Sequence, residues 1–174
     1  MLFRSKLDFK NFSYSDLEIQ LQKTSNDTYL KLFDLESPLI TDVSTLNSFF
    51  KFYANNENSD FNASFQVYEK LGSLSNDKYE FILPNYNLTK TIKTNNNLKG
   101  NLSFNSSGAN YIYETNVVES QIVNDLSYQS ENKFLNSGIV NKYNILFKNV
   151  NSNGKNSSKY RDKTRLEMLS SLIF

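Results

Sequence analysis

Residues 61–67 read Phe-Asn-Ala-Ser-Phe-Gln-Val, so apolar and polar side chains alternate along this stretch. Successive side chains of an extended strand point to opposite faces of a sheet. Phe61 and Phe65 would therefore share one face, and Asn62 and Gln66 the other. The stretch predicts a β-strand with one apolar face and one face of amides and hydroxyls.

The same period of two recurs along most of the chain. The other segments that alternate are 7–10, 17–22, 50–54, 79–88 (continuing past Pro84), 98–105, 111–116, 118–128 and 145–147. Segments rich in Asn, Ser, Asp and Gly separate them, and these residues favour turns: 55–60, 73–77, 94–97, 105–108, 136–138 and 151–158. This spacing predicts an all-β chain of roughly ten strands, each about 8–12 residues long, in an antiparallel meander.

The last segment of the chain fits two structures. Leu166, Met168, Leu172 and Phe174 fit a strand, whereas Leu166, Leu169, Leu172 and Ile173 fit a helix. We expect a strand, because the pattern upstream is strand throughout.

The composition excludes several kinds of chemistry. The 174 residues include 19 basic and 18 acidic side chains, for a net charge of +1, and no Cys, His or Trp. Zinc sites, thiolate nucleophiles, histidine bases and disulfides are therefore ruled out. A charge near zero also argues against nucleic acid as a partner, because such proteins need a basic surface.

No group of residues suggests catalysis, so we expect a protein that is not an enzyme and has no cofactor, metal or catalytic site. Glu114, Glu119 and Asp125 could be drawn as a carboxylate cluster, but we expect them to be solvated separately. The charged run of Arg161, Asp162, Lys163 and Arg165 is expected to be a solvated loop. No glycine pattern that would hold a phosphate is present.

Two architectures are compatible with the alternation. A soluble β-sandwich would bury the apolar faces in a shared core, whereas a transmembrane β-barrel would turn them to lipid around a hydrated lumen. The long alternating runs and the amide-rich polar face favour the barrel. So does a set of tyrosines near run ends, where interfacial aromatic residues belong: Tyr79, Tyr86, Tyr111, Tyr128 and Tyr143. The opening residues do not form a secretory signal, and no apolar stretch is long enough for a membrane-spanning helix.

Several segments, taken in order, resemble one known family. They are SNDTYLKLF (25–33), LNSFFKFY (46–53), FQVYEKL (65–71), KYEFILPNYNLTK (78–90) with its Leu83-Pro84 step, GNLSFNSSGANYIYET (100–115), IVNDLSYQS (122–130) and ILFKNVNSNGKNSSKY (145–160). Their order and spacing resemble the C-terminal barrel of the lipopolysaccharide-assembly outer-membrane proteins (the LptD, or organic solvent tolerance, family). The resemblance runs from about residue 8 to residue 174, and its later part includes a strand at Asn124-Asp125-Leu126 and a loop at 148–151.

The resemblance implies a function in transport. Members of this family form a large barrel in the Gram-negative outer membrane and insert lipopolysaccharide into its outer leaflet. The implied partners are lipopolysaccharide, outer-membrane lipid, a plug lipoprotein (LptE-like) in the lumen and a periplasmic bridge protein (LptA-like). The sugars would pass through the lumen while the acyl chains leave sideways through a seam between strands.

The chain is much shorter than members of that family. We therefore expect residues 1–174 to be a partial β-barrel domain, a fragment that lacks the N-terminal periplasmic domain and the remaining strands, with the C-terminal Phe174 there by chance. Two alternatives stay open: a segment of another outer-membrane barrel, of the porin or receptor type, and a soluble β-sandwich binding module.

Overall fold

A computed structural model describes residues 1–33, 40, 42–73, 78–94, 99–114, 116–135, 138–158 and 163–173. They form ten strands and one short helix. The strands are β1 (Leu2–Lys6), β2 (Tyr14–Gln20), β3 (Thr45–Asn56), β4 (Ser59–Lys70), β5 (Tyr79–Ile92), β6 (Gly100–Tyr113), β7 (Val117–Ser130), β8 (Lys133–Phe134), β9 (Val140–Lys155) and β10 (Lys163–Ile173), and the helix is α1 (Tyr29–Leu32).

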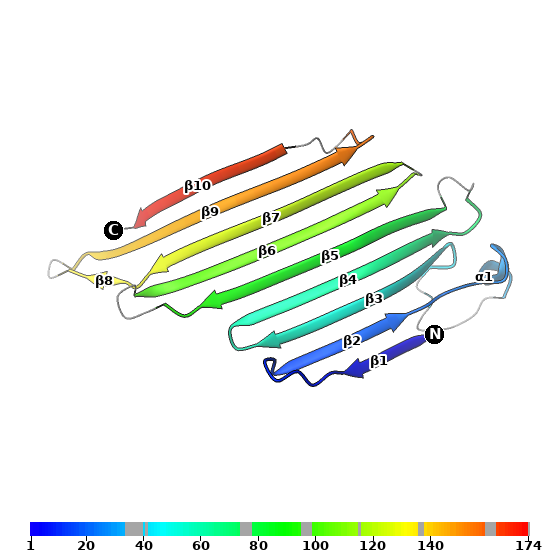
Figure 1. Cartoon of the computed structure of the whole chain (residues 1–174), viewed down its shortest axis with the longest axis horizontal. Helices are drawn as coiled ribbons and strands as arrows, with labels where there is room; N and C mark the ends of the chain where they lie inside the picture. Colours follow the sequence, from blue (N-terminus) through cyan, green and yellow to red (C-terminus); the bar gives the residue numbers. More distant parts are fainter. Residues whose placement is uncertain are drawn as a thin grey trace.

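All strands belong to one antiparallel meander (Figure 1). Their order is β1-β2-β3-β4-β5-β6-β7-β9-β10, and the two-residue β8 pairs with β9. Within the described ranges β1 and β10 each have one neighbour, so the sheet is open and does not close into a barrel. The all-β meander predicted from the sequence is confirmed, and so is the strand in the last segment.

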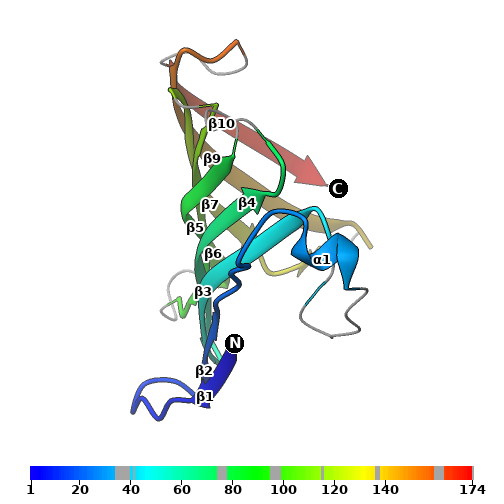
Figure 2. The same cartoon turned by 90° about the vertical axis from the view of Figure 1, so that its right-hand side faces the viewer.

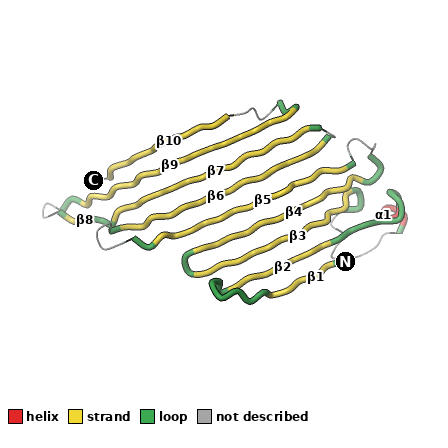
Figure 3. Tube along the Cα trace, in the orientation of Figure 1, coloured by secondary structure: helices red, strands yellow, loops and turns green. Residues whose placement is uncertain are grey.

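The sheet has two ends with different connections (Figure 3). We call the end with the tight β3–β4 turn at Glu57 and Asn58 the turn end, and the opposite end, which carries α1, the cap end. The connection from β2 to β3 is the longest, and its described residues (21–33, 40 and 42–44) lie at the cap end.

The sheet is a single twisted layer, as Figure 2 shows from the side. Its accessible surface is 12294 Å², against roughly 8,700 Å² for a compact monomer of this mass. Buried apolar side chains are correspondingly few: Leu30, Leu46, Phe49, Ala54 and Leu71. The described residues thus form one layer, rather than the two layers of the β-sandwich that the sequence also allowed.

Three of these five buried side chains form a small cluster around α1. Leu30 of the helix packs with Leu46 and Leu71, and Ile40 lies against them. The Asn26 side chain accepts a hydrogen bond from the Thr28 backbone N–H at 3.1 Å, which holds the turn that leads into the helix. The alternation analysis did not predict this helix.

Two predicted breaks in the pattern lie inside strands. Residues 105–108 continue β6, and residues 151–155 continue β9. Gly108 is needed there because a Cβ atom would lie 2.5 Å from Cε1 of Tyr86 on the neighbouring strand. The loop that the family resemblance placed at 148–151 is therefore also wrong, since these residues pair with β7 and β10.

Three other predictions have mixed outcomes. Residues 7–10 lie outside any strand, and the first strand is instead β1. β5 runs through Pro84 as predicted, with a register shift between Ile82 and Asn85. The predicted turn residues 74–77, 95–97 and 136–137 lie outside the described residues, as does Phe174.

Candidate functional surface

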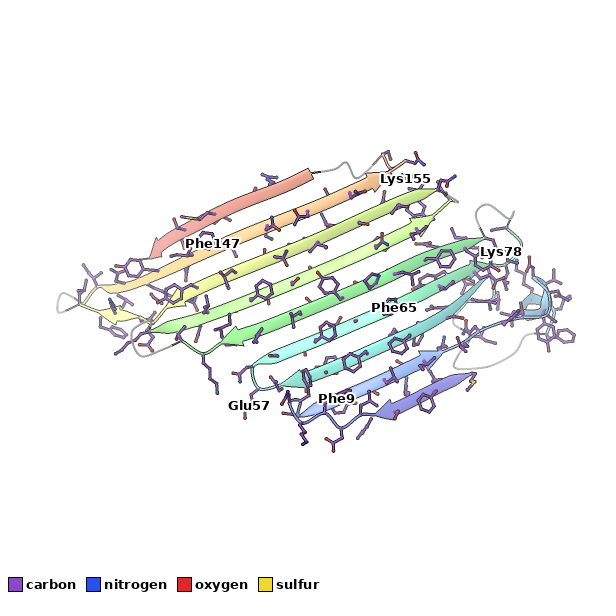
Figure 4. All side chains as sticks on the ribbon, in the orientation of Figure 1. Phe9, Glu57, Phe65, Lys78, Phe147 and Lys155 are labelled. Carbon is purple, nitrogen blue, oxygen red and sulfur yellow. The ribbon has the colours of Figure 1, made fainter. Side chains whose placement is uncertain are left out.

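Strand register divides the aromatic residues between the two faces of the sheet. We call the face that carries Phe65 and Phe147 the apolar face, and the opposite one, with Lys51 and Lys148, the polar face (Figure 4). Every phenylalanine of β1–β7 and β9 except Phe49 lies on the apolar face: Phe3, Phe50, Phe52, Phe61, Phe65, Phe81, Phe104 and Phe147.

These rings touch across strands yet stay half exposed. Phe50 and Phe65 are direct cross-strand partners with ring centroids 6.1 Å apart, and Phe52 and Phe61 are 6.0 Å apart on the diagonal. Phe50 is 39% exposed, Phe65 44% and Phe147 43%. The apolar face is therefore laterally packed, and rings on β3, β4 and β9 stay partly exposed, although Phe9 packs on Phe52 and Leu30 of α1 covers Leu46 at the cap end.

Charges divide in the opposite way. In β1–β7 and β9 the apolar face carries only Glu69, Lys90 and Lys155, each within two residues of a strand end. The charged residues on the polar face of the same strands are Arg4, Lys6, Asp16, Glu18, Lys51, Asp60, Lys70, Glu80, Glu119, Asp125, Lys142 and Lys148. Such a separation is what a sheet between an apolar medium and water requires.

On the polar face, charges of both signs lie opposite one another. Arg4 and Glu18 are register partners with Nη2 and Oε1 2.7 Å apart, and Lys148 and Asp125 are partners at 3.3 Å. Lys51 Nζ lies 3.9 Å from the centre of the Phe49 ring. Phe49, the one phenylalanine of these strands on the polar face, therefore has a cation over its ring. These contacts give the polar face a mixed-charge character.

The polar face is also hollowed near the turn end of β6, β7, β9 and β10. A depression of about 580 Å³ is lined by seven residues with hydroxyl or amide side chains and by Tyr128, Ile145, Leu146 and Leu169, so most of its exposed lining is apolar. Ser103 and Ser127 hydroxyls share a hydrogen bond of 2.6 Å there, and Asn144 donates to Ser171 at 3.3 Å. Such a surface offers donors and acceptors to a polyhydroxylated molecule.

One part of the apolar face is polar. Side chains from the middle of β5 to the cap-end half of β9 form a hydrogen-bonded ladder: Tyr86 with Ser106 at 3.2 Å, Ser106 to Asn124 at 2.7 Å, Asn124 to Asn149 at 3.4 Å and Asn151 to Asn149 at 2.6 Å. Asn110 and Ser120 add a further pair at 2.6 Å. The sequence analysis missed this ladder because Asn149 and Asn151 were read as loop and turn residues. The signal was the alternation of Asn149, Asn151 and Asn153 in phase with Ile145 and Phe147.

An ion-pair cluster fastens the α1 segment to the strands at the cap end. Lys78 Nζ lies 3.0 Å from Glu69 Oε1 and 3.3 Å from Asp27 Oδ1. These contacts raise the pKa of Lys78 above its usual value, and the hydrogen bond to Glu69 is a larger cause than the one to Asp27. The Gly72 backbone N–H, followed by Lys78, lowers the pKa of Asp27.

The carboxylates singled out in the sequence do not come together. Glu114 is in the β6–β7 turn and is exposed, Asp125 pairs with Lys148, and Glu119 lies six positions before Asp125 on the same strand. Glu119 is not solvated as expected, because it is only 6% exposed and accepts a hydrogen bond from the Ser157 hydroxyl. The expected charged loop is wrong for Lys163 and Arg165, which lie in β10 and pair with β9; Arg165 also pairs with Glu167, while Arg161 and Asp162 lie outside the described residues.

Most tyrosines of the strands lie within three residues of a strand end, as the sequence predicted for Tyr79, Tyr111, Tyr128 and Tyr143. Tyr86 differs, because β5 continues through Pro84 and places it in the middle of the strand. In the part of the chain described, no cluster of acidic residues is suited to a metal ion.

A scan against protein families finds no match, and a search of curated proteins also finds none. Among the described residues there is no helix with the length and apolar character needed to cross a membrane.

Proposed function

We propose that the chain is part of an outer-membrane translocon that assembles lipopolysaccharide into the outer leaflet of the Gram-negative outer membrane. The observation that carries the membrane part is the separation of phenylalanines and charges onto opposite faces of a one-layer sheet. The order of segments, which resembles that of the lipopolysaccharide-assembly family, supports lipopolysaccharide as the substrate.

In this proposal the apolar face contacts acyl chains. Each half-exposed phenylalanine then gains apolar surroundings that the chain itself does not supply. With about 44% of roughly 200 Å² exposed, contact of Phe65 with lipid contributes on the order of 2 kcal/mol. Repeated over the face, this gain stabilises a sheet that otherwise lacks a core.

The polar face would line the route of the sugar part of the lipid. Its hydroxyls and amides, above all around the depression of about 580 Å³, can exchange hydrogen bonds with a saccharide while the scattered charges keep the passage hydrated. The acyl chains need a path to hydrocarbon, and a seam between two strands of the complete barrel is the kind of opening that allows it. A plug lipoprotein and a periplasmic bridge protein would complete the translocon.

Photo-crosslinking from the polar face tests the proposal. A photoreactive amino acid replaces Ser127, which lines the depression, and a matched variant carries it at Phe147 on the apolar face. In cells that express the chain, we expect lipopolysaccharide adducts from the Ser127 position. Adducts from Phe147 should be mainly with phospholipid and with the acyl part of lipopolysaccharide.

A diffusion pore or receptor barrel is the second candidate, because it would use the same two faces. It predicts lipid adducts from Phe147 and no lipopolysaccharide adducts from Ser127. Absence of lipid adducts from both positions would refute a membrane location altogether.

A further inference from the structure

The apolar region does not run straight across the strands. One unbroken row of register partners joins Ala63, Tyr86, Gly108, Ile122 and Asn151, from β4 to β9. At its β4 end this row has phenylalanines of β3 and β4 as neighbours on the apolar face. At its β9 end it lies in the asparagine ladder. The apolar residues of β9 are found instead nearer the turn end, at Ile145 and Phe147.

The size of this displacement gives an angle. On the apolar face of β3, the apolar residues are centred between Phe50 and Phe52. The row of register partners that starts there reaches β9 between Asn151 and Asn153, about six residues from the centre of Ile145 and Phe147. Six residues correspond to roughly 20 Å along a strand, and the five strand spacings between β3 and β9 to roughly 24 Å across the sheet. The apolar band is therefore inclined by about 40° to the perpendicular of the strands, which falls within the tilt of about 35–45° that strands of membrane barrels adopt.

We infer that the bilayer meets this sheet obliquely along that band, and that the polar part of the apolar face at the cap end contacts lipid headgroups rather than acyl chains. We call this part the amide patch: Ser106, Asn110, Asn124, Asn149, Asn151 and Asn153. This inference rests on the proposed function, since it assumes that the apolar face meets a membrane.

The chemistry of the amide patch fits headgroups. It is continuous with the apolar face along β6, β7 and β9, and no charged residue interrupts it before Lys155. Amides placed in hydrocarbon would cost several kcal/mol each unless fully bonded, whereas headgroup phosphates, esters and sugars supply partners. Ile122 within the patch, and Ile112 and Val118 in the next row beyond the patch toward the cap end on the same face, are apolar side chains that the inclined band does not account for.

The arrangement predicts different depths for residues on the same row. Ala63 and Asn151 are four strand spacings apart, or roughly 19 Å, so an inclination of about 40° separates them by about 12 Å along the membrane normal. If the strands were instead parallel to the normal, the two residues would lie at equal depth. Phe147 should lie near the depth of Ala63 despite being on the same strand as Asn151.

Spin labels on single cysteines measure these depths directly, because the chain has no native Cys. The variants Ala63→Cys, Phe147→Cys and Asn151→Cys of the full chain are labelled and reconstituted in phosphatidylcholine vesicles, with Glu57→Cys in the β3–β4 turn as an aqueous reference. Circular dichroism checks that each variant keeps its strands. Depth is read from the relative accessibility of the label to oxygen and to a water-soluble nickel chelate.

We expect labels at 63 and 147 deep in the hydrocarbon and the label at 151 about 12 Å shallower. Equal depth at 63 and 151 would overturn the inclined band and leave the membrane proposal standing. If all labels are as accessible to the nickel chelate as the label at 57, the proposed function fails as well. If Asn151→Cys loses its strands, Asn153→Cys on the same face of β9 replaces it, and the inclined band again requires a label shallower than the label at 63.

Discussion

Replacing Phe65 with lysine tests whether the apolar face meets lipid. Phe65 lies in the middle of β4, opposite Phe50, and is 44% exposed in the free sheet. The variant Phe65→Lys loses about 2 kcal/mol of lipid contact from the exposed part of the ring. It also adds about 2–4 kcal/mol for a cation near the bilayer midplane. The sum, about 4–6 kcal/mol, is of the same order as the whole stability of many domains.

The matched control changes the same strand on the other face. Asn62 is exposed and belongs to the polar face, so Asn62→Lys should change stability by about 0–1 kcal/mol. Both variants are refolded into phospholipid vesicles and unfolded with urea, with circular dichroism of the strands as the signal. Equal stability of the two variants in vesicles would refute the assignment of the faces, and greater loss for Asn62→Lys would reverse it.

Two further predictions concern packing and pH. Gly108→Ala places a methyl group 2.5 Å from Cε1 of Tyr86 and 3.2 Å from the Gln121 carbonyl oxygen, so the Tyr86 ring must move and its bond to Ser106 is lost. We expect a loss of about 1–3 kcal/mol in urea unfolding, with Ser107→Ala nearly neutral, and an unchanged midpoint would contradict the close approach. The second prediction concerns the stability of the α1 segment. Because the pKa of Asp27 is lowered in the folded state, its contribution to this stability is complete above the ordinary Asp pKa of about 4 and is lost as the pH falls through the folded-state pKa. Because the pKa of Lys78 is raised, its contribution is complete below about 10.4 and is lost as the pH rises through the folded value. Hydrogen exchange at the Leu32 amide, corrected for intrinsic rate, should thus be constant at intermediate pH and faster at both extremes, and Asp27→Asn should remove the acidic change. Persistence of that change in Asp27→Asn would exclude Asp27 as its cause.

The alternation of side chains predicted the fold because the sheet has a single layer. Each strand has only two environments, so a period of two is written into the sequence wherever one face is apolar, as in 61–67 and 50–54. The last segment shows the same logic. Its helical alternative fitted the spacing equally well, and the strand forms because β9 offers a long unpaired edge to β10.

The predictions from the sequence were wrong where segments rich in Asn, Ser and Gly were taken as turns. Asn and Gly tolerate turns, but they also occur in strands when a neighbour needs space or a hydrogen bond. Gly108 lies beneath a tyrosine ring and Asn151 bonds to Asn149, and neither contact is visible without the pairing of β5–β6 and β7–β9. The α1 cluster was missed for a similar reason, since Leu30, Leu46 and Leu71 meet only once the meander is formed.

The shape of the apolar face indicates what kind of partner it suits. A protein partner would favour pockets and protruding anchors, whereas Phe50 and Phe65 on the neighbouring strands β3 and β4 and Phe147 on the distant β9 are exposed to nearly the same extent. On β4 the face is free of charge from Ser59 to Val67 and meets a charge only at Glu69. The Ser59–Glu69 stretch measures roughly 34 Å along the strand, or about 26 Å along a normal inclined by about 40°. This matches the apolar belt of about 25 Å found around membrane barrels. An even surface, limited in height and crossing successive strands at one inclination, is what a fluid hydrocarbon layer requires. This match between the inclination and the belt height is an argument for lipid that the alternation pattern alone could not supply.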